Sequence, residues 1–146
     1  MSQVVSTRLP DDTAERLKRF ARRLGKTPSE TGAILIEESL REAEFAFIEF
    51  RNSPVGRCAY MKNSNLTVWQ VMIIAQKYDL QPNKIAQHFQ RPQEWVLAAL
   101  NYSEAYPLEI EDAISDYQAL NYTALKRILP QVELIKVPSE VLLEEE

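Results

Sequence analysis

The chain has 146 residues, 45% of them hydrophobic and 26% charged, which suits one globular domain or two very small ones. A single cysteine, Cys58, excludes an internal disulfide, and with the single histidine, His88, it leaves few ligands for a transition metal. We therefore expect no metal and no cofactor. No apolar run approaches the roughly 20 residues of a membrane span, and the N-terminus lacks the pattern of a signal peptide. We expect a cytoplasmic protein without membrane contact.

Charge is distributed unevenly along the chain. Residues 1–103 carry 14 Lys or Arg and 11 Asp or Glu, whereas residues 104–146 carry 3 and 10. A mildly basic body and an acidic end indicate different partners for the two ends. The alternative is an acidic terminus that is simply solvated.

The N-terminal pattern predicts one strand followed by two helices. Residues 4–9 form a short β-branched run that Pro10 closes. Apolar residues then recur at helical spacing until Gly25, a residue typical of a helix end. Thr27 reads as an N-cap, with Pro28 in the first turn and Glu30 completing a capping box, so we expect a second helix from Pro28 to about Phe50.

The predicted strand has no partner strand nearby in the sequence. The same strand of a second copy, related by a two-fold axis, would satisfy its backbone groups. Alternation would turn Val5, Thr7 and Leu9 toward the helices, and Val4, Ser6 and Arg8 outward. A two-stranded ribbon is about as wide as the major groove of DNA. An edge strand of a mixed sheet is the alternative interpretation.

Residues 3 to about 45 resemble the ribbon-helix-helix family of CopG, Arc and MetJ in the order, lengths and caps of these elements. The resemblance implies an intertwined homodimer that binds operator DNA. By position, Val4, Ser6 and Arg8 would contact bases, Arg8 suiting guanine, and Thr27 and Ser29 would hold a phosphate at the helix start. Whether such dimers pair into dimers of dimers stays open.

The first predicted helix carries a row of basic residues, comprising Arg16, Arg19, Arg23 and Lys26 with Lys18 and Arg22 beside it. Such a row attracts DNA over a distance, but an ordinary solvated helix surface has the same composition.

A turn-rich junction at residues 51–56 predicts a boundary, and helices should follow it. Thr67 to Gln70 forms a second capping box that opens a helix to about Tyr78, and Pro82 and Pro92 each stand at the first position of a further helix. This order is the outline of a helix-turn-helix unit. Few base-reading side chains accompany it, so we expect protein docking or subunit assembly rather than DNA contact.

About 60 residues of this region resemble a small domain of uncharacterised role that accompanies antitoxins, including VapB-like ones. The motifs are Gly56-Arg57, Ala59-Tyr60, Leu66-Thr67-Val68-Trp69, Ile85-Ala86, Ala98-Ala99-Leu100-Asn101-Tyr102 and Tyr106-Pro107-Leu108-Glu109-Ile110. The family usually has Gly-Thr-Arg where this chain has Asn63-Ser64-Asn65. Because Asn tolerates the left-handed conformation that Gly adopts, we expect the turn to be kept.

The acidic C-terminal region predicts a helix over 111–120, a second helix over 122–129 that Pro130 ends, and then apolar residues among acids. Antitoxins resemble this layout, with DNA binding at one end and a toxin-binding segment at the other. The resemblance implies that this region binds a cognate toxin protein, and it most suggests a PIN-type ribonuclease. A disordered tail without a partner is the alternative. The expected toxin-binding residues are Leu129, Val132, Leu134, Ile135, Val137, Val141 and Leu142.

Motifs for catalysis are missing from the sequence. Three glycines cannot build a phosphate-binding loop, and Cys58 and His88 lack any orienting signature. We expect a protein that is not an enzyme and has no catalytic residue. The predicted fold is mainly α: a ribbon-helix-helix domain over 1–50, a helix-turn-helix-like module over 51–112 and an acidic tail over 113–146. The predicted function is that of a type II antitoxin that represses its own operon. The alternatives are a free-standing transcription regulator and an adaptor that has lost DNA binding.

Overall fold

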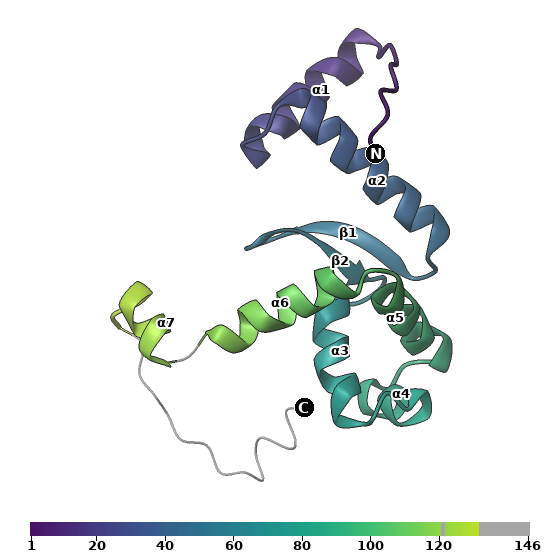
Figure 1. The fold of residues 1–146 in the computed structure, drawn as a ribbon, viewed down its shortest axis with the longest axis vertical. Helices are drawn as coiled ribbons and strands as arrows, with labels where there is room; N and C mark the ends of the chain where they lie inside the picture. The colour runs from purple at the N-terminus through teal and green to yellow at the C-terminus, as the bar shows by residue number, and fades with distance from the viewer. Residues whose placement is uncertain (121, 132–146) are drawn as a thin grey trace.

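A computed structural model describes residues 1–120 and 122–131, which form a mainly helical protein with one two-stranded antiparallel sheet (Figure 1). A helical hairpin of α1 and α2 lies at one end, the β-hairpin crosses the middle, and α3 to α6 pack at the other end. The elements are α1 (Asp11–Leu24), α2 (Pro28–Glu44), β1 (Ile48–Ser53), β2 (Gly56–Met61), α3 (Val68–Lys77), α4 (Pro82–Phe89), α5 (Gln93–Ala105), α6 (Pro107–Ala119) and α7 (Tyr122–Ile128).

Local chemistry sets several of the helix ends, as the sequence predicts. Gly25 ends α1 in the left-handed conformation, at φ 67°. The Thr27 hydroxyl accepts a hydrogen bond from the Glu30 N–H at 3.1 Å, which satisfies one free donor of α2. The box at Thr67 and Gln70 is reciprocal, with bonds of 3.2 and 2.8 Å. Pro92 is the N-cap of α5 and not its first residue.

The expectation of one helix to Phe50 and no second strand is wrong. Helix α2 ends at Glu44, Phe45 is extended, and Phe47 adopts φ 61°. The chain then enters β1, which pairs with β2 in register from Ile48 opposite Met61 to Ser53 opposite Gly56. Of the expected junction at 51–56, residues 51–53 end β1, residues 54 and 55 form the tight turn, and Gly56 begins β2. The apolar run at 45–50 fits a helix and a strand equally well, and the pairing with 56–61 selects the strand.

The core belongs to the second half of the chain. Ile48 and Met61 of the hairpin pack with α3, α4, α5 and α6 around the buried Trp95, Val96 and Tyr102. Ile110 and Ile114 of α6 close this core, so α6 is part of the module. The expected domain limits at 50/51 and 112/113 therefore fall inside β1 and inside α6.

Residues 1–44 bury very little. Ala21 is the only buried apolar side chain of this half, and the other buried residues are Thr31 and Glu38. Thr31 Oγ1 has no hydrogen-bond partner among the described residues. A helical hairpin with so small a core depends on contacts outside itself for its stability.

Candidate nucleic-acid interface

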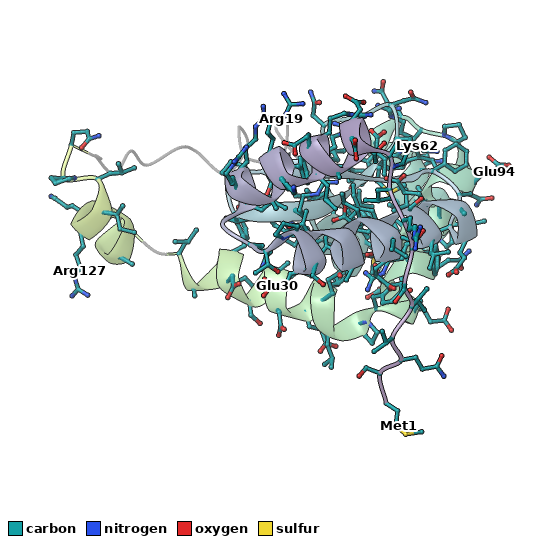
Figure 2. The ribbon with its side chains drawn as sticks, turned by 90° about the horizontal axis from the view of Figure 1, so that it is seen from above. Met1, Arg19, Glu30, Lys62, Glu94 and Arg127 are labelled. Atoms are coloured by element: carbon teal, nitrogen blue, oxygen red, sulfur yellow. The ribbon has the colours of Figure 1, made fainter. Side chains whose placement is uncertain are left out.

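The N-terminal segment, residues 1–9, is exposed and has no secondary structure in the single chain. Val4 is 96% exposed and Val5 87%. The expected strand is thus not formed within one chain, because the sheet of the described residues comprises β1 and β2 alone. In Figure 2 the segment runs away from the helices to Met1. Its backbone groups are available to another molecule.

The three expected base-contacting residues, Val4, Ser6 and Arg8, lie in this segment at alternating positions. They make no side-chain hydrogen bond or ion pair with the described part of the chain. A cation, a hydroxyl and a small apolar side chain are all groups that can contact base edges.

The start of α2 lies next to the turn that joins the two helices. Thr27 caps the helix, and Ser29 is exposed in its first turn. The Thr27 oxygen already accepts a bond from the Glu30 N–H, but its own O–H can still donate to a phosphate. Pro28 supplies no N–H, and the Glu30 carboxylate stands in the same turn. This helix start is therefore a weaker anion site than one with all its free N–H groups and no carboxylate nearby.

The exposed face of α1 is the main positive surface of this half. Asp12 pairs with Arg16 at 3.7 Å and Glu15 with Lys18 at 3.5 Å. The remaining cations are Arg19, Arg22 and Arg23 of α1 and Lys26 just after it. They form no ion pair with the residues that the structure describes. An unneutralised cluster of this kind attracts a polyanion.

A buried ion pair fixes the helical hairpin to the rest of the protein. The Arg57 guanidinium on β2 donates to the Glu38 carboxylate on α2 through Nε at 3.1 and 3.2 Å and through Nη2 at 2.6 Å. Arg57 Cζ also lies 5.7 Å from the ring centre of Phe20 on α1. Glu38 is only 7% exposed, so its charge needs this partner. Since Arg57 contacts α2 through Glu38 and α1 through Phe20, its side chain ties both helices to the β-hairpin.

A second network joins α2 to α5 and α6. Arg41 donates to Glu37 at 2.9 Å, to the Tyr102 hydroxyl at 2.8 Å and to Glu109 at 2.9 Å, and its Cζ stacks 3.7 Å from the Tyr106 ring centre. Tyr102 donates to Glu109 at 2.5 Å. Burial, together with the bond to Glu109 and its charge, raises the pKa of Tyr102. Burial opposes the charge of Arg41, but its three hydrogen bonds outweigh this, and its pKa is raised.

Sequence reasoning missed both networks. Arg57, Tyr102 and Glu109 stand in the motifs quoted for the second resemblance, but nothing local links them to Glu38 and Arg41, which lie 19 to 68 residues away. Their consequence is that α2 has one fixed direction relative to the second half of the chain.

In the helix-turn-helix-like part, the last helix, α5, carries no Lys or Arg. Helices α3, α4 and α5 pack together, and Gln90 makes the left-handed turn before α5. The exposed face of α5 comprises Gln93, Glu94, Leu97, Asn101, Glu104 and Ala105. Arg91 bonds the Asn63 carbonyl at 2.9 Å, which takes the nearby cation away from this face. Asn63 itself adopts φ 61°, the left-handed turn expected there.

The predicted toxin-binding residues fall mostly outside the described part of the chain. Leu129, 41% exposed, follows α7 next to Ile128, 70% exposed, and Figure 2 shows Arg127 on α7 well apart from the main body. The other expected residues, Val132, Leu134, Ile135, Val137, Val141 and Leu142, lie outside the described residues.

Residues 1–120 and 122–131 lack two further classes of site. No group of three or more His, Cys, Asp or Glu side chains there could hold a metal ion. No helix in that part is both long and apolar enough to cross a membrane. The chain matches no protein-family model, no curated protein and no solved structure.

Proposed function

We propose that this protein is a dimeric DNA-binding antitoxin whose N-terminal segments pair into an antiparallel ribbon. The observation that supports the proposal is the exposed, unpaired segment 1–9 in front of a helical hairpin that buries one apolar side chain. Pairing with a second copy would satisfy the backbone groups of residues 3–9 and cover Val5 and Leu9.

The ribbon would present Val4, Ser6 and Arg8 to the major groove. Arg8 could donate two hydrogen bonds to a guanine, Ser6 could bond either base type, and Val4 could contact a thymine methyl. The free cations of α1 and the hydroxyls of Thr27 and Ser29 would contribute phosphate contacts that carry no sequence information. This arrangement suits repression of the operon that encodes the protein.

The toxin-binding role is assigned to the chain after α6. Residues 120–146 carry 3 basic and 5 acidic side chains, and apolar residues are interleaved among the acids. The body that precedes them is complete without α7, since the buried core ends at Ile114. A segment of this composition suits ordering on a partner such as a PIN-type ribonuclease.

Binding to the DNA upstream of its own coding sequence tests the first half of the proposal. We expect Arg8→Ala to weaken binding about 5- to 150-fold, as loss of a contact worth roughly 1–3 kcal/mol requires. Lys84→Ala removes an exposed cation of α4 and should leave the affinity unchanged. Equal affinity of the Arg8→Ala and wild-type proteins would exclude Arg8 as a base contact.

Co-expression with the adjacent open reading frame tests the second half. A tagged full-length chain should retain the toxin, and a chain that ends at Ala119 should lose it while its core stays folded. DNA binding without a partner would indicate the free-standing regulator. A chain with no salt-dependent affinity for any duplex would indicate the adaptor.

A further inference from the structure

A groove of about 570 Å³ lies between helix α5 and the connection that joins α2 to β1. The connection contributes the four consecutive residues 44–47, and α5 contributes Glu94, Leu97, Ala98 and Asn101. The α5 residues recur at intervals of three, one and three, which places them in one stripe along the helix. We call this concave surface the α5 groove.

Contacts behind the α5 groove fix its two walls. Phe45 is half-buried, and its ring centre lies 5.4 Å from that of Tyr102 and 5.7 Å from that of Tyr106, at the C-terminal end of α5. Phe47 has a left-handed φ of 61°, which a bulky residue rarely adopts, and its carbonyl accepts a hydrogen bond of 2.7 Å from the Lys62 N–H. The groove is therefore formed in the free protein, and a ligand does not have to order its walls.

The centre of the α5 groove is apolar. Phe47 from the connection is 38% exposed and Leu97 from α5 is 42% exposed, whereas Ala98 beside Leu97 is buried. Single exposed apolar residues are ordinary on a protein surface, but these two line one concave surface from its opposite walls. One large apolar side chain of a ligand would shield both from water.

Each wall also carries a carboxylate without a counter-ion. Glu44 and Glu94 line the groove, and neither forms an ion pair with the residues that the structure describes. Among the described residues that line the groove there is no Lys or Arg. Figure 2 shows Glu94 at the outer edge of the main body. An apolar centre between two unneutralised carboxylates repels nucleic acid and attracts a ligand that carries cations.

We propose that the α5 groove binds a basic peptide segment of another protein. One large apolar side chain of that segment would lie between Phe47 and Leu97, and a Lys or Arg on either side of it would pair with Glu44 and Glu94. The C-terminal region of this chain has the wrong charge for the role, because residues 120–146 carry 3 basic and 5 acidic side chains. The groove does not include the N-terminal segment or the chain after α6, so the proposal does not depend on the proposed DNA or toxin binding.

Selection from a phage-displayed library of random peptides of about 12 residues, on the immobilised full-length protein, identifies the ligand class without assuming a partner. We expect the enriched peptides to carry one large apolar residue flanked by two or more Lys or Arg. A synthetic peptide of the enriched sequence should bind more weakly as the salt concentration rises. No enrichment above a surface without protein, or enrichment of peptides without cations, would overturn the proposal.

Substitutions in the groove show whether the selected peptide binds there. Leu97→Asp and Glu94→Arg should each weaken its binding about 10-fold, because one removes an apolar contact and the other reverses a charge. The matched controls are Leu108→Asp on α6, 72% exposed, and Glu104→Arg, which is exposed on α5 but outside the groove. Both controls should bind as the wild type does, and circular dichroism checks that all four variants are folded.

Two results of this comparison contradict the proposal. If Leu97→Asp and Glu94→Arg bind the peptide as tightly as the controls do, the α5 groove is not the binding site. If Glu94→Arg instead lowers the molar mass of the protein in the absence of peptide, the groove is occupied by a second copy of this chain.

Discussion

Replacing Arg57 with methionine should destabilise the protein far more than replacing a comparable exposed arginine. Arg57 makes three contacts of 2.6 to 3.2 Å with Glu38, whose side chain is 10% exposed. Arg57→Met would leave that carboxylate in a site with little water. Removing one partner of a buried pair costs about 3–5 kcal/mol, and we expect about 3 kcal/mol because the Arg57 side chain keeps 20% exposure.

The opposite substitution should cost less. In Glu38→Gln the amide oxygen can still accept from Arg57, which also keeps its bond to Asn52 Oδ1 at 3.0 Å. We expect a loss of about 1 kcal/mol. The control is Arg51→Met on β1, whose ion pair with Glu49 is 34% exposed on both sides. An exposed pair of this kind contributes at most about 1 kcal/mol.

Urea-induced unfolding, followed by circular dichroism, gives the free energy of unfolding of each variant. The expected order of destabilisation is Arg57→Met, then Glu38→Gln, then Arg51→Met. If Arg57→Met and Arg51→Met lose the same amount, the Glu38 pair does not anchor α2, and the reasoning is refuted.

Three further predictions concern single side chains. Thr31→Val should stabilise the protein by about 1 kcal/mol in the same assay, because it removes a buried hydroxyl without a partner at nearly constant volume; destabilisation would indicate a hydrogen bond there. Thr67→Ala should cost about 1 kcal/mol by removing the reciprocal cap of α3, whereas unchanged stability would show that the cap is unimportant. Burial and Glu109 raise the pKa of Tyr102 above its ordinary value. The neutral Tyr102 hydroxyl therefore makes its full contribution to folding stability below about pH 10, and this contribution is lost at higher pH. Wild-type stability should therefore fall more steeply above pH 10 than that of Tyr102→Phe, and parallel curves would contradict this assignment.

Local signals in the sequence predict several of the helix starts and ends. Gly25 predicts the end of α1, Thr27 and Pro28 the start of α2, and Thr67 with Gln70 the start of α3, because caps act within four residues of each other. The β-hairpin could not be predicted in the same way. Phe45, Phe47 and Phe50 continue an apolar helical pattern, and only the distant strand at 56–61 makes the extended conformation favourable.

The candidate site likewise contains residues that local sequence predicts and residues that it does not. Residues 4, 6 and 8 stand out in the sequence because alternation is local. The pairs of Glu38 with Arg57 and of Arg41 with Glu109 appear only when α2 is placed against β2 and α6.

Amide hydrogen exchange of residues 3–9 in the intact protein tests the ribbon most directly. In an antiparallel ribbon alternate amides bond across the two strands, so we expect alternate residues of this segment to exchange slowly at concentrations where the protein is dimeric. Dilution to the monomer should remove that protection. Exchange of all these amides at the rate of an unstructured peptide, in a protein whose measured mass is that of a dimer or larger, would contradict the ribbon.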